Sequence, residues 1–178
     1  MLFRYYKDNQ YLNTHHFKRR KISRAILLDK NNNVCILTIE RNDIFGNYKY
    51  IETPGGGKEK KESYEKAIIR EIDEEVGVKC IVIKKIGIIV DYYNLLNRKN
   101  INHYFLCKIV GNSKIHHESY GDSFIKNISF YPIKEIIDMY NNLENTGVPF
   151  LIKRRELPIF LKAYNILNKG EFNERYRN

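Results

Sequence analysis

Cysteine is scarce in this sequence, and the few cysteines present are poorly placed for disulfides or metal. The 178 residues include 3 cysteines, Cys35, Cys80 and Cys107, and an odd, scattered set provides neither a disulfide framework nor a C-x-x-C metal motif. Each lies in an apolar run typical of a strand, so we expect three buried structural thiols. The adjacent His15 and His16 are expected to form a surface feature rather than a metal site.

Long hydrophobic runs are also missing. The best apolar stretch, residues 81–90, is interrupted by Lys84 and Lys85 and falls short of the roughly 20 residues that span a bilayer. Residues 1–5 carry neither an apolar segment nor a small-residue cleavage site, so we expect no secretory signal. The sequence therefore predicts a cytoplasmic protein without a membrane span.

Acidic residues are outnumbered by basic ones. The 21 Asp and Glu residues stand against 31 Lys and Arg residues, which gives a formal net charge of +10. A basic surface attracts the phosphates of a nucleotide or of RNA, but the abundance of Lys, Asn, Ile and Tyr could equally follow from biased codon usage. If RNA is the ligand, the basic runs at residues 18–21 and 153–155 are its expected contacts.

Length and composition predict one folded domain covering residues 1–178. Hydrophobic residues make up 43% of the chain, which is ordinary for a globular protein and argues against disorder. Residues 1–20 are interpreted as an N-terminal extension, which could serve as a swapped arm in a homodimer. Residues 170–178 are interpreted as a frayed tail.

Hydrophobic patterning predicts both strands and helices. Two β-rich runs, at residues 22–29 and 34–40, flank an Asn-rich turn and predict a hairpin. Further strands are expected at residues 48–51, 79–90, 101–110 and 128–131, and helices at residues 63–76, 132–140 and 156–167. Strands on both sides of a central helix, with another helix at the end, indicate an α/β (α+β) fold, an α/β/α sandwich around a mixed β-sheet.

A glycine-rich loop and an acidic helix carry the strongest chemical signal. The loop at residues 54–57 (Pro-Gly-Gly-Gly) follows a strand, and its glycines allow close backbone approach to a ligand and offer N–H groups to anions. In the helix that follows, Glu71, Glu74 and Glu75 fall within roughly a third of the circumference. Like charges at these spacings destabilise a helix by ~0.2–0.5 kcal/mol per pair, and a Mg²⁺ ion bound to the carboxylate oxygens resolves the conflict.

Residues 56–78 match a complete family motif. The pattern G-x5-E-x7-R-E-U-x-E-E-x-G-U, with U aliphatic, is the Nudix box, and a chain of this length would contain it by accident with a chance on the order of one in ten million. Every specified position is filled, by Gly56, Glu62, Arg70, Glu71, Ile72, Glu74, Glu75, Gly77 and Val78. The sequence therefore resembles the Nudix hydrolase family.

The resemblance implies a metal-dependent hydrolase. Members of the family bind Mg²⁺ or Mn²⁺ on the box helix and hydrolyse a nucleoside diphosphate linked to another group. By position, Glu71 and Glu75 are the expected main metal ligands, the backbone carbonyl of Gly55 joins them, and Glu74 is a further ligand or the general base. The base stays open between Glu71, Glu74 and a loop residue outside the box. Arg70 is expected to orient Glu74 within this catalytic set.

The polar loop at residues 111–127 is the expected source of one more acidic ligand, as in some family members. Glu118 and Asp122 are the candidates, and we single out Glu118. The positions just before the next strand are Lys126 and Asn127, neither of them acidic, which departs from the family pattern.

Residues outside the box are expected to select the substrate. Arg41, Tyr48 and Lys58 surround the glycine loop in sequence and could contact phosphate, and Tyr92 could stack on a base. No proline follows the box at the spacing found in members specific for ADP-ribose, which disfavours that substrate. Tyr92 and Tyr93 favour a dinucleoside polyphosphate instead.

Three functions remain open. The leading one is a metal-dependent pyrophosphohydrolase that cleaves a nucleoside diphosphate linked to another moiety, such as a nucleotide, a dinucleoside polyphosphate or a nucleotide sugar. The second acts on the 5′ end of RNA and is favoured by the basic charge. The third is a silent, nucleotide-sensing Nudix domain, which would usually have lost box carboxylates that are all present here.

Overall fold

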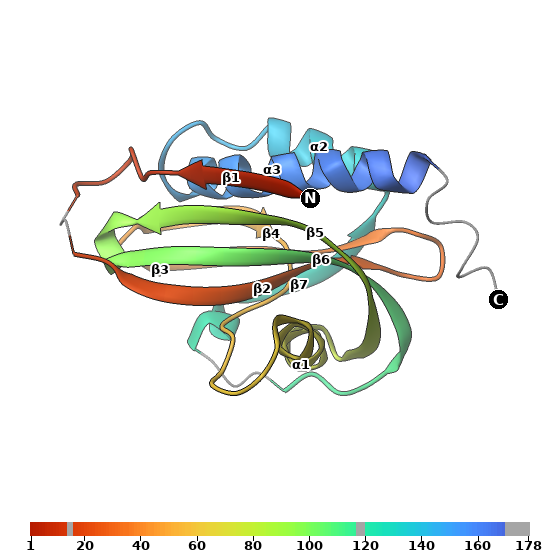
Figure 1. Cartoon of the computed structure of the whole chain (residues 1–178). Helices are drawn as coiled ribbons and strands as arrows, with labels where there is room; N and C mark the ends of the chain where they lie inside the picture. Colours follow the sequence, from red (N-terminus) through yellow and green to blue (C-terminus); the bar gives the residue numbers. More distant parts are fainter. Residues whose placement is uncertain (14–15, 117–119, 170–178) are drawn as a thin grey trace.

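The sheet lies between two layers of helices. The computed structural model describes residues 1–13, 16–116 and 120–169, so the predictions for His15, Glu118 and the tail at 170–178 lie outside the described residues. Helix α1 (Tyr64–Val76) covers one face of the sheet, and helices α2 (Ile133–Asn141) and α3 (Gly147–Asn168) cover the other (Figure 1). The predicted α/β/α sandwich around a mixed sheet is confirmed.

Seven strands form this sheet in the described part of the chain. They are β1 (Leu2–Tyr6), β2 (Lys18–Leu28), β3 (Val34–Asp43), β4 (Gly46–Glu52), β5 (Val78–Tyr93), β6 (Arg98–Asn112) and β7 (Ile125–Tyr131), with 3₁₀ turns η1 (Asn94–Leu96) and η2 (Tyr120–Phe124). The order is β1-β5-β6-β2-β3-β4, and β7 pairs with β3. β1 runs parallel to β5, and β2 runs parallel to β6, whereas the other pairs are antiparallel.

Strands β2 and β3 form the predicted hairpin but separate soon after the turn. Their register is limited to Leu28 opposite Val34. Beyond that point the glycine loop, not β3, lies beside β2. The hydrogen bond from Ala25 N–H to the carbonyl of Pro54, at 3.0 Å, shows this pairing. The divergence of these strands opens the space in which the functional site lies.

Helix α1 begins and ends where the sequence predicts. The Ser63 hydroxyl accepts a hydrogen bond from the backbone N–H of Lys66 at 3.1 Å, as a helix N-cap does. Gly77 closes the helix with φ of 71°, and its N–H donates to the carbonyl of Asp73 at 3.1 Å. This left-handed conformation favours glycine, so the motif glycine ends the helix for a steric reason.

Two elements begin earlier than predicted. The segment interpreted as an N-terminal extension contains β1, which pairs with β5 of the same chain and places Tyr5 opposite Val90. Helix α3 begins at Gly147 rather than at residue 156. A run of charged residues interrupts the apolar pattern there, although Arg155 and Glu156 are themselves buried, with 2% and 0% of their surface exposed.

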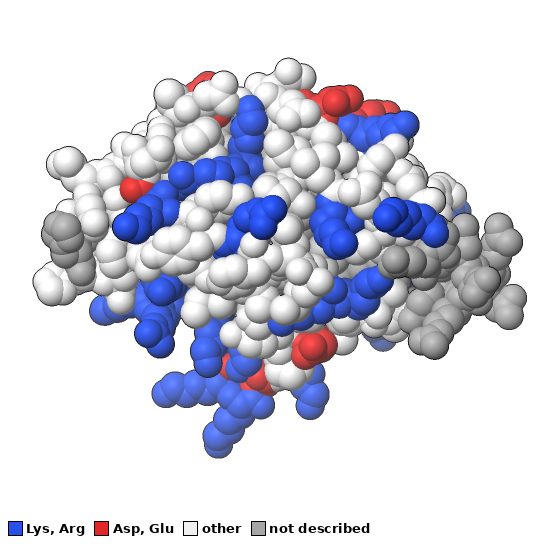
Figure 2. All heavy atoms as spheres, turned by 45° about the horizontal axis from the view of Figure 1, so that its top comes forward, with Lys and Arg blue, Asp and Glu red and all other residues white. Residues whose placement is uncertain are grey.

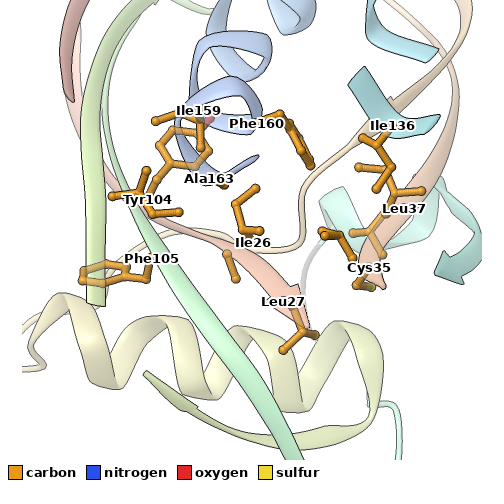
Figure 3. Packing of buried hydrophobic residues seen from close by; sticks show 14 of the residues in the cluster. Ile26, Leu27, Cys35, Leu37, Tyr104, Phe105, Ile136, Ile159, Phe160 and Ala163 are labelled. Atoms are coloured by element: carbon orange, nitrogen blue, oxygen red, sulfur yellow. The ribbon is translucent and has the colours of Figure 1, made fainter. Parts of the chain in front are cut away.

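The core fills both sides of the sheet. In Figure 3, the neighbouring β2 residues Ile26 and Leu27 point in opposite directions, Ile26 toward Ile159 and Phe160 of α3 and Leu27 toward α1. This alternation is the two-residue period of a strand. The three cysteines are free and buried, so the prediction of structural thiols is confirmed.

The surface carries its positive charge broadly. On the face drawn in Figure 2, Lys and Arg side chains lie at many separate places and acidic ones are few. Charge alone therefore does not mark one binding site on this face. Among the described helices, none is long and apolar enough to cross a membrane.

Candidate active site

The glycine loop is pressed between β2 and α1. Ser23 N–H donates to the carbonyl of Gly56 at 3.0 Å. Gly55 has φ of +134°, and a Cβ on it would come within 2.2 Å of the Ser23 carbonyl oxygen. A Cβ on Gly56 would lie 2.3 Å from a carboxylate oxygen of Glu71. Glycine is therefore required at position 55, because a side chain there would collide with the backbone of β2, whereas a Cβ on Gly56 would displace the Glu71 carboxylate from its present place.

The three box glutamates are buried against this loop. Glu71, Glu74 and Glu75 have only 8%, 7% and 7% of their surface exposed. The Glu75 carboxylate accepts a hydrogen bond from Gly55 N–H at 2.7 Å. Helix α1 thus directs three carboxylates toward the glycine backbone. Burying charged groups costs free energy, so this arrangement indicates that charge has a role at this site.

Arg70 connects the glutamates to the loop. One guanidinium nitrogen lies 3.0 Å from both Glu71 and Glu74, and the other donates to Glu62 and to the carbonyl of Gly57, each at 3.0 Å. Glu62 in turn accepts from the N–H of Glu59. A planar guanidinium can hold several oxygens at fixed angles, so Arg70 fixes the helix, the loop and the carboxylates relative to one another.

Burial changes the acidity of these carboxylates. Loss of solvation raises the pKa of Glu71 to about 7, although Arg70 opposes the shift. Loss of solvation also raises the pKa of Glu75 to about 8, against the opposing hydrogen bond from Gly55. Asp122 of η2 faces the same space and raises both pKa values further. The site therefore concentrates negative charge that a cation would stabilise.

The donor chemistry fits a hard divalent cation. Carboxylate oxygens are the ligands that Mg²⁺ and Mn²⁺ prefer, and four acidic side chains face one space. Within residues 1–13, 16–116 and 120–169, however, no three His, Cys, Asp or Glu side chains are already arranged around a single point. Arg70 separates Glu71 from Glu74, so a bound ion would require these side chains to turn.

The glutamates form one wall of a deep cleft of about 780 Å³. Arginines from three strands line it, namely Arg20, Arg41 and Arg98. Apolar and aromatic side chains complete it, among them Ile44, Tyr50, Tyr93, Leu96 and Phe124. A cleft with carboxylates, cations and rings suits a ligand that carries both phosphates and an aromatic base.

Comparison with known proteins identifies the family. A family model described as the NUDIX domain matches residues 18–151, well over half of the chain. The chain belongs to the Nudix hydrolase family. The predicted family, and with it the predicted class of pyrophosphatase hydrolase, is confirmed.

Solved structures show the same fold in other Nudix proteins. A NUDIX hydrolase from Nitrosomonas europaea has a TM-score of 0.62 at 16% identity, covering 83% of this chain and 90% of its own. A MutT protein from Methanosarcina mazei Go1 has a TM-score of 0.60 at 20% identity, covering 86% and 97%. A UDP-X diphosphatase has a TM-score of 0.55 at 19% identity, covering 85% and 66%. A search of curated proteins gives no match.

The four predicted substrate-binding residues of this Nudix chain do not lie together. Arg41 lines the cleft, where it is paired with Asp43 and donates to the Tyr50 hydroxyl at 3.3 Å. The other three lie elsewhere: Tyr48 beside Gly147, Lys58 over the ring of Tyr64, and Tyr92 against Tyr5. Tyr93, the neighbour of Tyr92, lines the cleft instead.

A buried ionic network beneath the cleft was not anticipated. The Glu156 carboxylate, fully buried, accepts from the N–H and hydroxyl of Thr53 at 2.9 and 2.8 Å. Arg155 donates to Glu156 at 2.8 Å and to the Tyr93 hydroxyl at 3.2 Å, and Glu52 pairs with Arg155. The network holds α3 against the strand that leads into the glycine loop.

This network corrects one expectation about RNA. Arg155 is buried, so residues 153–155 do not form a continuous exposed basic surface. The sequence contained a signal for this. Residues 151, 152, 155, 156, 159 and 160 repeat at helical spacing, and all six are buried, so periodicity alone would have assigned Arg155 and Glu156 to the inner face of α3.

Divalent cations should stabilise this protein more strongly as the pH rises. Without a cation, the folded-state pKa values of about 7 for Glu71 and about 8 for Glu75 exceed the ordinary value of 4.5. The stability that the two protonated carboxyls contribute is therefore complete below pH 4.5 and is lost as the pH rises through 7 and 8. A bound cation would offset this loss, because metal binding displaces the protons.

Melting temperatures with and without MgCl₂ at pH 6.0 and 8.5 measure the effect. We expect a larger rise at pH 8.5 than at pH 6.0, and little rise in the double variant Glu71→Gln, Glu75→Gln. Glu144→Gln, at an exposed position, is the matched control and should behave like the wild type. A rise that is equal at both pH values would contradict the expectation.

Proposed function

We propose that this Nudix hydrolase is a Mg²⁺- or Mn²⁺-dependent pyrophosphohydrolase that cleaves a nucleoside diphosphate linked to another moiety. The observation that carries the proposal is the burial of three box glutamates in the wall of a cleft that six arginines also line, Arg20, Arg41 and Arg98 among them. Buried carboxylates destabilise a fold unless they are compensated. Buried carboxylates that share a cleft with arginines able to bind phosphate therefore support a catalytic role.

The proposed roles follow the contacts of each side chain. Glu71 and Glu75, with the carbonyl of Gly55, would hold the cation, which neutralises the pyrophosphate and activates water. Glu74 would serve as a further ligand or accept the proton of the attacking water. Arg70 would keep Glu74 in place, because it already contacts that carboxylate at 3.0 Å.

The cleft supports a substrate with more than one phosphate and at least one base. Arg20 and Arg98 supply positive charges for the phosphates, and Arg41 lies in the same lining although it is paired with Asp43. Phe124 offers a partly exposed ring within the same space, beside the largely buried rings of Tyr50 and Tyr93. A volume of about 780 Å³ lies in the upper part of the range for small-molecule sites, roughly 300–1,000 Å³. These features favour a dinucleoside polyphosphate or a nucleotide sugar over a mononucleotide.

A second candidate is hydrolysis at the 5′ end of RNA. The observation that favours it is the exposed basic run at residues 18–21, of which Arg20 also lines the cleft. A silent nucleotide sensor is disfavoured, because every box carboxylate is present and three of them, Glu71, Glu74 and Glu75, line the cleft.

Replacing Glu75 by Gln should lower turnover by several orders of magnitude while the fold stays intact. Glutamine can still accept the hydrogen bond from Gly55 N–H, but it is neutral and binds a hard cation poorly. The assay is release of nucleoside monophosphate from a panel of nucleoside-diphosphate derivatives in Mg²⁺ or Mn²⁺. Glu135→Gln, exposed on α2, is the control, and near-normal turnover in the Glu75 variant would reject the assignment.

Replacing Arg98 by Ala should raise KM about tenfold with little change in kcat. Arg98 is exposed at the cleft and belongs to no ion pair within the described residues, so its loss leaves no partner stranded. A hydrogen bond to a charged group contributes about 1.5 kcal/mol, which is roughly a factor of ten. Steady-state kinetics would show the change, with Lys30→Ala as control, and an unchanged KM would exclude Arg98 from phosphate binding.

A further inference from the structure

A second surface of the sheet brings aromatic rings and cations together outside the cleft. Strand register places Arg19, Lys99 and Tyr92 in one row across β2, β6 and β5. The next row contains Lys21 and, on β1, Tyr5. Side chains in one row point to the same face. The name aromatic–basic face is used below for the surface formed by seven residues: Phe3, Tyr5, Phe17, Arg19, Lys21, Tyr92 and Lys99.

This face is opposite to the cleft. The cleft is lined by Arg20, Arg98 and Tyr93, and each of these alternates along its strand with a member of the aromatic–basic face. Successive side chains of a strand point to opposite sides. The face therefore lies on the side of the sheet that α1 covers, past the beginning of that helix, where Tyr64 stacks on His103.

Three rings of this face, those of Tyr5, Phe17 and Tyr92, pack against one another and remain at least partly exposed. Phe3 and Tyr5 have 57% and 46% of their surface exposed. The Tyr92 ring lies 5.6 Å from that of Tyr5 and 4.7 Å from that of Phe17, and the Tyr5 hydroxyl donates to the Tyr92 hydroxyl at 2.9 Å. Beside them lies a hollow of about 240 Å³, which Lys7 also lines. Exposed rings arranged in this way offer flat surfaces to a ligand.

The cations beside these rings are available for an anion. Lys99 Nζ lies 5.5 Å from the Tyr92 ring and 5.8 Å from the Tyr5 ring. Arg19 and Lys21 are exposed, and the described residues give none of the three an ion pair. The acid that borders the hollow, Asp8, already accepts backbone N–H groups, including that of Asn94 at 2.8 Å. Lys7, Arg19, Lys21 and Lys99 outnumber this one acid, so the local net charge is positive.

We propose that the aromatic–basic face binds single-stranded RNA. Rings with cations between them match the alternation of bases and phosphates in a single strand, in which bases stack and phosphates pair with the cations. An acidic peptide would use the cations and leave the rings without a role. The choice of RNA over DNA rests on the second candidate under the proposed function, hydrolysis at the 5′ end of RNA, because that end can carry the pyrophosphate bond that the cleft would cleave.

The position of the face connects it to the cleft. Arg19 and Lys99 belong to the face, whereas the adjacent residues Arg20 and Arg98 line the cleft. An RNA strand bound on the face would therefore reach the cleft by passing the N-terminal ends of β2 and β6, where these residues lie. The face would act as a binding site for the body of an RNA whose 5′ end enters the cleft.

Binding of a fluorescein-labelled ten-nucleotide RNA with a 5′-hydroxyl group, measured by anisotropy in EDTA, tests the proposal without hydrolysis. Tyr5→Ala should weaken binding at least fivefold, because a stacking ring is lost, and Tyr5→Phe should retain it. The double variant Arg19→Glu, Lys99→Glu should weaken binding at least tenfold and flatten the salt dependence, because each neutralised phosphate contributes about 0.7 to the log–log slope.

The matched control is the double variant Lys30→Glu, Lys162→Glu, which changes the net charge equally at exposed positions. Lys30 follows the far end of the eleven-residue strand β2, so it lies roughly 30 Å or more from Arg19. The control should bind RNA within twofold of the wild type. Circular dichroism would establish that each variant is folded.

Equal affinity of all variants would overturn the proposal, as would binding of single-stranded DNA or polyglutamate at least as tight as that of RNA. The result is separable from the proposed hydrolase activity. Tyr5→Ala should still cleave small nucleoside-diphosphate substrates, and a wild-type protein that binds RNA but cleaves neither these substrates nor 5′-triphosphorylated RNA would refute the hydrolase assignment and leave the RNA-binding proposal standing.

Discussion

The burial of like-charged carboxylates on one face of α1 is the constraint on which the site depends. Glu71, Glu74 and Glu75 lose most of their solvation, and the fold compensates only partly. Arg70 pairs with two of them, and Gly55 N–H donates to the third. The loss of solvation that these contacts do not compensate raises the pKa values of Glu71 and Glu75. These carboxylates therefore destabilise the fold when no cation is bound, and their oxygens are suited to bind one.

The rest of the architecture serves to hold this helix face against the glycine loop. The loop can lie beside β2 because β3 diverges, and because Gly55 and Gly56 have no side chains to collide. On its other side, Thr53 is bonded to the buried Glu156 of α3. Buried charges are tolerated only when they are well partnered, and here the partners connect the site to the far helical layer. Helix α3 thus supports the site although it contributes none of the box residues.

The sequence predicted most closely the parts whose determinants are local. The N-cap at Ser63, the glycine at position 77 and the spacing of the glutamates are each decided within a few residues, so α1 and the motif could be inferred directly. The ionic network could not, because Arg155, Glu52 and Arg24 are far apart in the sequence and meet only through tertiary packing. The same limit applies to the tyrosines. The sequence indicates Tyr92 and Tyr93 as candidates, but strand register decides that Tyr93 lines the cleft and that Tyr92 lies on the opposite face.

The buried box glutamates are proposed to hold a divalent cation, and the other proposed roles depend on that ion. Electron paramagnetic resonance of Mn²⁺ tests it directly, because the signal of free Mn²⁺ disappears when the ion binds. The account predicts that the wild-type protein removes the signal at micromolar to millimolar Mn²⁺ with at least one ion per chain, and that the variant Glu71→Gln, Glu75→Gln does not. Equal Mn²⁺ binding by the two proteins would contradict it.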